Sequence, residues 1–246
     1  MSAPLTTPPP FDLQPPPPPI ASGSAWSTWE DVLDIFYAPR EVFERRRDGR
    51  YMIPLVISLV ISVVIYLLAQ QMNEALQDVE FARAMARQGN MTPEQIAQSK
   101  VFAEKFRSVG LYFIPVGLAI VAWISGLVIM LLSSMMGGRV NFAQGTTIAV
   151  LAGMPELLGR TLVSLQGLFL DTSTAATRYS FSFNASRFMG ADTNNWLLKV
   201  GALADPFVIW GLFLVGLGVY VIGKMEKEKA AVLAIIYALV VMALAR

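Results

Sequence analysis

Five long blocks of apolar residues constrain what this chain can fold into more than any other feature of its sequence. The first two blocks, 51–70 and 110–136, contain no charged residue. As helices that rise about 1.5 Å per residue, both are long enough to cross a bilayer core of about 30 Å. Lipid offers no hydrogen-bond partner to an exposed backbone, so such continuous segments are expected to cross it as helices.

The remaining three blocks, 143–170, 204–223 and 230–245, predict further transmembrane helices, although the last is barely long enough to span. The composition agrees, because 54% of the residues are hydrophobic and only 15% are charged, against about 25% charged in a typical soluble domain. We therefore expect an all-α fold, a polytopic membrane helical bundle of about five transmembrane helices within residues 51–246.

The first 25 residues have a different character from the rest of the chain. Nine of the fifteen prolines lie within residues 1–19, five of them in the run Pro15–Pro19. Proline fixes φ and lacks an N–H group, so such a stretch favours extended polyproline conformations over helix or sheet. We expect residues 1–25 to be a flexible arm, either without a role of its own or docking to a partner.

Residues 26–50 predict two short amphipathic helices at the membrane surface. Trp29, Val32, Leu33 and Phe36 recur at helical spacing, and Pro39 should end that helix. A second short helix should then present Val42 and Phe43 on its apolar side. Four arginines follow directly before the first apolar block: Arg45, Arg46, Arg47 and Arg50. This basic cluster is expected to lie at the depth of the lipid headgroups.

The composition also excludes several kinds of chemistry. The chain has no histidine and no cysteine, which removes disulfides, thiolate chemistry and histidine-ligated zinc or haem. A histidine-assisted hydrolase is excluded for the same reason. A net charge of +1 gives no field that would attract nucleic acid. We therefore expect no catalytic residue, no metal and no cofactor.

One pair of opposite charges lies inside a predicted span. Glu156 and Arg160 are four residues apart, so they share one helix face and can form an ion pair. Each charge costs about 2.5–3.5 kcal/mol at the centre of an inserted helix. The sequence thus favours a buried, structural intramembrane ion pair. A proton or ion relay through Glu156 remains the alternative.

Several short motifs resemble bacterial members of the YIP family, the Ypt/Rab-interacting-protein domain. The first runs from Phe36 to Phe43 and contains Pro39 and Arg40. The second is Met154-Pro155 in the third block, and the third contains Asp205, Pro206, Phe207 and Trp210. The resemblance implies an all-helical domain with five spans, a cytoplasmic amino terminus, no enzymatic activity and no cofactor. The chain lacks the Asp-Leu-Tyr-Gly-Pro motif of eukaryotic relatives, so binding of small GTPases is not inferred.

These observations favour a non-enzymatic, YIP-like protein of the bacterial inner membrane that scaffolds or accompanies a larger membrane system. Its partners would be the lipid bilayer and other membrane proteins. One alternative is a transporter or permease component that uses Glu156 as a coupling group. Another is a lineage-specific subunit of an energy-converting or photosynthetic membrane complex. The arginine cluster before the first span, together with the lysine-rich turn at 224–229, predicts a cytoplasmic amino terminus.

Overall fold

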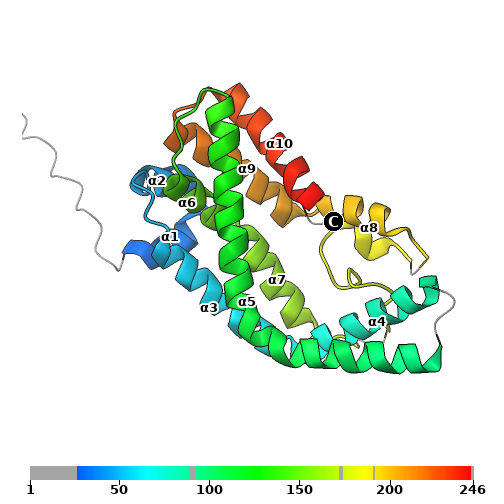
Figure 1. Ribbon diagram of the computed structural model, residues 1–246. Helices are drawn as coiled ribbons and strands as arrows, with labels where there is room; N and C mark the ends of the chain where they lie inside the picture. The colour runs from blue at the N-terminus through cyan, green and yellow to red at the C-terminus, as the bar shows by residue number, and fades with distance from the viewer. Residues whose placement is uncertain (1–26, 89–91, 172–173, 191, 245–246) are drawn as a thin grey trace, which may run out of the picture.

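The structure, a computed structural model, describes residues 27–88, 92–171, 174–190 and 192–244, and all of its regular elements are helical (Figure 1). The predicted proline-rich arm 1–25 lies outside the described residues. The helices are α1 (Ser27–Asp34), α2 (Pro39–Arg45), α3 (Met52–Leu68), α4 (Gln70–Gln88), α5 (Pro93–Met135), α6 (Phe142–Ala152), α7 (Met154–Gln166), the 3₁₀ helix η2 (Ala185–Phe188), α8 (Asn195–Leu203), α9 (Pro206–Gly223) and α10 (Lys227–Leu244). The all-α prediction is confirmed.

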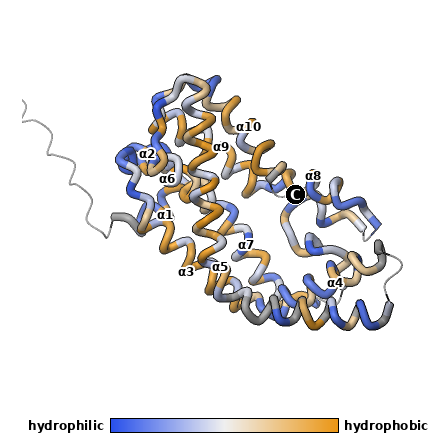
Figure 2. The backbone as a smooth tube through the Cα atoms, viewed as in Figure 1, coloured by the Kyte–Doolittle hydropathy of each residue, from blue (hydrophilic) through white to orange (hydrophobic). Residues whose placement is uncertain are grey.

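Helix α5 begins well before the predicted span 110–136. Thr92 caps it by accepting a hydrogen bond from the Gln95 amide at 3.3 Å, while the Gln95 side chain accepts one from the Thr92 amide at 2.9 Å. This reciprocal cap starts the helix at Pro93, and α5 then continues unbroken for 43 residues to Met135. The polar segment before the apolar block is therefore part of the same helix. Figure 2 shows α5 changing from mixed polarity to uniformly apolar along its length.

One end of the bundle gathers the short connections. The Arg139 amide donates to the Gly223 carbonyl at 3.4 Å, and the Ser133 hydroxyl lies 3.6 Å from the Met225 sulfur. The Gln144 side chain donates to the Arg47 carbonyl at 2.7 Å, which holds the end of the amphipathic segment against the start of α6. Helices α3, α6, α9 and α10 therefore all have an end here, which we call the basic face because it contains Arg45–Arg47, Arg50, Arg139 and Lys224–Lys229.

Three helical stretches are long and apolar enough to cross a membrane: Tyr112–Met135 in α5, Phe142–Gln166 across α6 and α7, and Pro206–Gly223. A fourth is counted if α3 and Gln70–Met85 are one span bent by 76°. Helix α10 has 18 residues, but it opens on Lys227, Glu228 and Lys229. The protein is thus a multi-pass membrane protein, and the predicted count of five spans is not confirmed for the described residues.

The tightest packing lies where α6 crosses α5 and α9. A Cβ on Gly126 would collide with Thr146, and one on Gly145 would collide with the Gly126 carbonyl oxygen. On the other side of α6, a Cβ on Gly218 would come within 2.8 Å of Ile148. Small residues let helix backbones approach closely in a membrane, where lipid is as apolar as the side chains.

Thr146 and Thr147 are fully buried on α6, and each hydroxyl donates at 2.9 Å to a carbonyl one turn earlier. Both hydroxyls therefore have a hydrogen-bond partner although α6 lies at the centre of the bundle. Fully buried Phe43, from α2, also packs against the Gly218 position, so the amphipathic segment contributes to the core.

Candidate functional site

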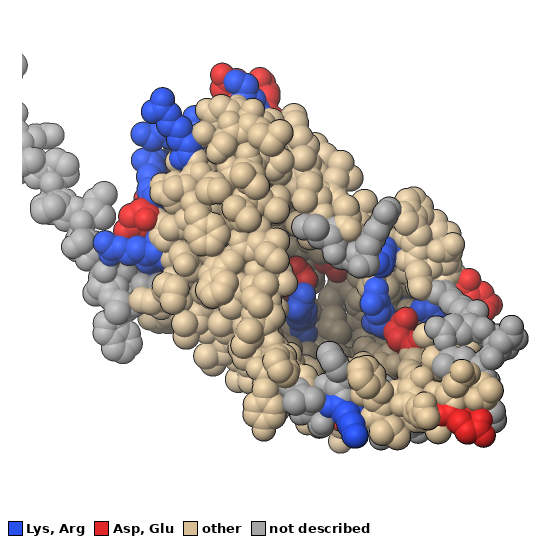
Figure 3. Space-filling model, in the orientation of Figure 1, with Lys and Arg blue, Asp and Glu red and all other residues tan. Residues whose placement is uncertain are grey.

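A hollow opens in the half of the bundle farthest from the basic face. Helix α5 packs along α6, but it has little contact with α7, which follows after a break at Gly153. The space between them is lined by α3, α5, α7, α9 and α10 and by the loop 178–184. It comprises two adjoining parts of about 480 and 790 Å³ that share Glu156, Arg160 and Arg178. Figure 3 shows charged side chains around this depression.

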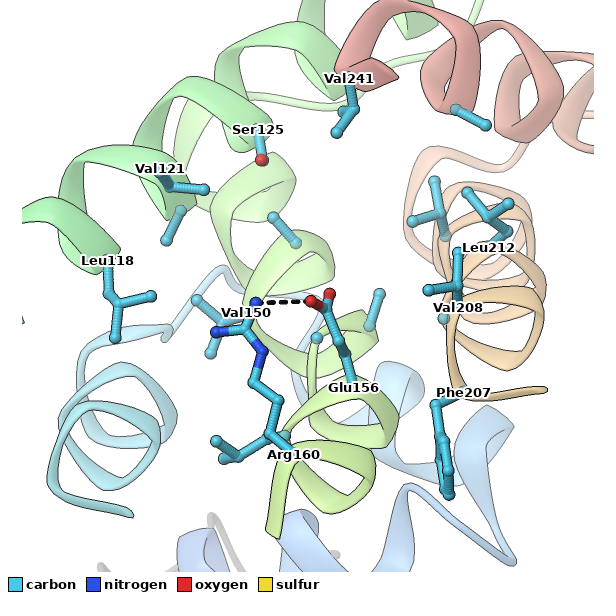
Figure 4. A pocket seen from close by; sticks show the side chains of 18 of the residues that line it. Leu118, Val121, Ser125, Val150, Glu156, Arg160, Phe207, Val208, Leu212 and Val241 are labelled. Carbon is cyan, nitrogen blue, oxygen red and sulfur yellow. Dashed lines mark hydrogen bonds and ion pairs between the residues drawn. The ribbon is translucent and has the colours of Figure 1, made fainter. Parts of the chain in front are cut away.

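Glu156 and Arg160 project from α7 into the hollow (Figure 4). Arg160 Nη2 lies 2.6 Å from Glu156 Oε1, so the ion pair forms within one helix turn. The two side chains remain 58% and 51% exposed, however, and the prediction that they are buried is wrong. The physical reason is the separation of α5 from α7, which leaves this face of α7 without a helix packed on it.

Arg178, in the loop before η2, is the second arginine of the hollow. Its amide donates to Glu80 on α4 at 3.0 Å, and its guanidinium donates to the Tyr179 hydroxyl at 2.7 Å. The guanidinium carbon also lies 4.8 Å from the centre of the Tyr179 ring. These contacts fix Arg178 in place although its side chain is exposed.

Lys199, on α8, completes the basic side of the hollow. Sequence reasoning missed Arg178 and Lys199, because isolated basic residues in a loop and a short helix give no signal of their own. Only the fold brings them beside Arg160. The opposite wall is apolar and comes from α5, α9 and α10, through Leu118, Val121, Leu212, Val241 and Met242.

A second charged cluster joins α1 to α2. Asp31, with a side chain only 1% exposed, is bonded to Arg45 at 2.6 Å and to Arg46 at 2.5 Å. Arg45 also reaches Asp34 at 2.5 Å. We call these four residues the Asp31 cluster.

Two of the four predicted headgroup arginines are therefore engaged inside the protein, and Arg46 is only 10% exposed. Arg47 and Arg50 are more exposed and pair with Glu44 and Asp48. The prediction that the whole cluster faces the headgroups is wrong for Arg46, because folding α2 back on α1 places it against Asp31.

Electrostatics in the Asp31 cluster favour the charged form of Asp34. The Tyr37 hydroxyl donates a hydrogen bond to Asp34, which, together with Arg45, holds the pKa of Asp34 below its usual range. The same hydrogen bond to a carboxylate raises the pKa of Tyr37. Asp34 thus stays ionised to a lower pH than an ordinary aspartate.

The motif residues that carry the resemblance are mostly structural. Pro39 occupies the first turn of α2, and exposed Arg40 pairs with Glu44 at 3.1 Å. Buried Pro155 lies in the first turn of α7, after the break at Gly153. These positions shape the chain and do not converge on the hollow.

The third motif starts helix α9. Asp205 caps it by accepting from the Phe207 amide at 2.8 Å, and Pro206 follows at the first helical position, where its missing N–H costs little. The Phe207 ring packs edge-on against the Phe183 ring, with 5.7 Å between the ring centres. The Phe207 side chain also lines the hollow. The ring centre of Trp210 lies 6.5 Å from that of Phe36 in the amphipathic segment.

The side chains that line the hollow are of kinds that bind ligands. Within the described ranges, acidic residues do not gather into any group that could hold a metal ion. Glu156 is paired with Arg160, and the hollow's other carboxylate, Asp205, caps α9. Arginine, lysine and tyrosine side chains beside an apolar wall are suited to an anion with an apolar part.

The sequence matches a known protein family over most of its length. Residues 33–245 match the Yip1 domain, a match that begins within the amphipathic segment and covers α2 to α10. No curated protein and no solved structure matches the chain significantly. The family match extends over far more than half of the sequence and takes in all three motifs described above. The chain therefore belongs to the Yip1 domain family of integral membrane proteins.

Proposed function

We propose that this protein is a non-enzymatic scaffold or accessory subunit of a larger membrane system. The observation that carries the proposal is the apolar part of α5, Tyr112–Met135. Its most apolar 18 residues have a mean hydropathy of 2.4, yet only 17% of those residues are buried inside the chain. A strongly apolar helix that buries so few of its residues inside its own chain presents a broad face to other membrane helices or to lipid.

Crosslinking tests this proposal directly, because a chain without cysteine allows single cysteines to be placed at will. Leu131 is 50% exposed on α5, whereas Ile129 on the same helix is fully buried. In native membranes, Leu131→Cys should crosslink to a discrete protein partner, and Ile129→Cys should not. The proposal would be overturned in favour of a transporter if Leu131→Cys formed no crosslink to another protein and the purified protein carried a pH-driven flux in liposomes.

We also propose that residues 1–25 dock to that partner. Proline-rich segments are already extended, so they lose little conformational freedom when they bind. A chain lacking residues 2–24 should keep its melting temperature in detergent but retain less partner during purification. A large fall in melting temperature would show instead that the arm packs on its own domain.

The proposed orientation places the basic face in the cytoplasm of a bacterial cell, with α1 lying at the inner-membrane interface. Trp29, Leu33 and Tyr37 support this position, because they point outward along one helical face and are 49%, 52% and 74% exposed. Ser24→Cys and Arg246→Cys should be labelled from opposite sides of the membrane. Labelling of both from one side would exclude an odd number of spans.

A further inference from the structure

The hollow has two chemically different ends. Arg160, Arg178 and Lys199 make one end basic, with the Tyr179 phenol beside them. Leucine and valine side chains of α5, α9 and α10 make the other end apolar, and Figure 4 shows them facing the same space as Arg160. A ligand that fills both ends must combine an anionic group with a hydrocarbon part.

The charges of the lining favour an anion next to the apolar wall. Three basic side chains and one acid, Glu156, line the part of about 480 Å³, so basic side chains outnumber acidic ones there. The adjoining part adds Asp205, whose carboxylate already accepts the Phe207 amide as the cap of α9. The part of the hollow with more basic than acidic side chains is therefore the part that also contains the apolar side chains of α10.

The two arginines are held in position and retain donors. Arg178 is fixed by Glu80 and Tyr179, while Arg160 is fixed by Glu156. A guanidinium has five N–H donors, and the contacts with Tyr179 and Glu156 each use only part of that set. The contact with Glu80 is made by the Arg178 backbone amide. Donors that are positioned before a ligand arrives bind it with a smaller loss of side-chain entropy.

The depth of the basic end corresponds to a membrane surface. Phe207 and Val208, in the first turn of α9, line the hollow, so its basic end lies where this span begins. Lys199 precedes the span on α8, and Arg178 lies on a loop. From there the apolar wall runs along α5 and α10 toward the interior of the bundle.

We propose that this hollow binds one anionic phospholipid. The lipid phosphate accepts hydrogen bonds from Arg160, Arg178 and Lys199, and one acyl chain lies against the apolar wall. The volume of about 480 Å³ is within the range of small-molecule sites, roughly 300–1,000 Å³. The site belongs to this chain alone and does not depend on the scaffold role proposed above.

Native mass spectrometry of the full chain, released from micelles with defined lipids, tests the proposal. Phosphatidylglycerol and phosphatidylcholine with identical acyl chains are compared. The wild type should retain phosphatidylglycerol preferentially. Arg178→Gln together with Lys199→Gln should weaken that retention about 25-fold, or about fivefold for each basic group. Arg187→Gln, an exposed substitution on nearby η2, should change nothing. Equal retention of both lipids by the wild type would overturn the proposal.

A competition experiment distinguishes binding of a lipid from binding of free phosphate. Millimolar inorganic phosphate should not displace phosphatidylglycerol from the wild type, because it lacks the apolar part. Full displacement would overturn the lipid assignment in favour of a free-anion site. If the double variant does not fold, Ala238→Phe fills the apolar wall from α10 and should reduce lipid retention. Unchanged retention in that variant would overturn the proposal.

Discussion

Two ion-pair clusters of this protein have similar chemistry and opposite surroundings. Asp31, Arg45 and Arg46 lie in the amphipathic segment, where the arginines were expected at the lipid headgroups, and Asp31 is almost fully enclosed. Glu156 and Arg160 lie in an apolar span, where burial was expected, and both are more than half exposed on the wall of the hollow. The burial of both clusters is therefore predicted wrongly when it is inferred only from the segment in which the residues lie.

The two clusters differ in how far apart in the sequence their paired residues lie. Glu156 and Arg160 are one turn apart, so their contact forms on any helix and carries no information about the rest of the fold. Asp31 reaches Arg45 and Arg46 across 14 and 15 residues, which requires α2 to fold back on α1. A contact of the second kind fixes tertiary structure, and its loss should therefore have the larger effect.

The largest expected effect is that of Asp31→Asn. The substitution leaves Arg46, only 10% exposed, facing a neutral group in a buried place. Removing one partner of a buried pair costs about 3–5 kcal/mol. The free energy of unfolding in mixed detergent micelles should fall by that amount. A loss below about 1 kcal/mol would mean that solvent reaches the cluster, and the contrast between the clusters would then disappear.

The next largest effect is expected for Arg46, and the neighbouring Arg47 provides a matched control. In Arg46→Met, Asp31 keeps Arg45 but loses its second charged donor, at a cost of about 1.5–3 kcal/mol. In Arg47→Met, a half-exposed pair with Glu44 at 3.7 Å is lost, and we expect a change within about 1 kcal/mol. The same unfolding measurement ranks the two variants. Equal effects would contradict the burial of Arg46.

Glu156→Gln should change stability less than Asp31→Asn. An exposed pair on one helix contributes about 0–1 kcal/mol, since water and salt screen it. Unfolding in micelles should show a loss of that size, with Arg160→Gln as the partner variant. A loss of about 3 kcal/mol or more would show that another helix covers the pair in the assembled protein.

The smallest expected effect concerns acid. Because the pKa of Asp34 is lowered by Tyr37 and Arg45, this carboxylate stabilises the fold at all pH values above the pKa of an unfolded aspartate. The contribution declines as the pH falls below about 4 and through the lowered pKa. The fall in stability on acidification should therefore be shallower in Asp34→Asn than in the wild type. Identical pH profiles would contradict the shift.

The helical class and several local starts could be predicted from the sequence, because they depend on neighbouring residues. Apolar blocks predicted the membrane helices, and the predicted block 204–223 closely matches α9, Pro206–Gly223. The length of α5 was not predicted, since the helix that starts at Pro93 continues into the apolar block without a break.

The candidate site was largely beyond prediction. Glu156 and Arg160 were identified, but Arg178 and Lys199 join them from a loop and from α8 only after the chain has folded. Sequence periodicity describes one helix at a time, so it cannot show that α5 leaves α7 and opens a hollow. The Asp31 cluster was missed for the same reason, although an acidic turn before an arginine run was a signal of complementary charge.

The contact of Gly126 with Thr146, and of Gly145 with the Gly126 backbone, has a mechanical consequence. Two helices that touch through their backbones cannot slide or approach further, so α5 and α6 behave as one rigid unit. Beyond Gly153 no such contact restrains α7 against α5. If the hollow changes width, the motion must come from α7, α10 or the loop 178–184, with Gly153 as the pivot.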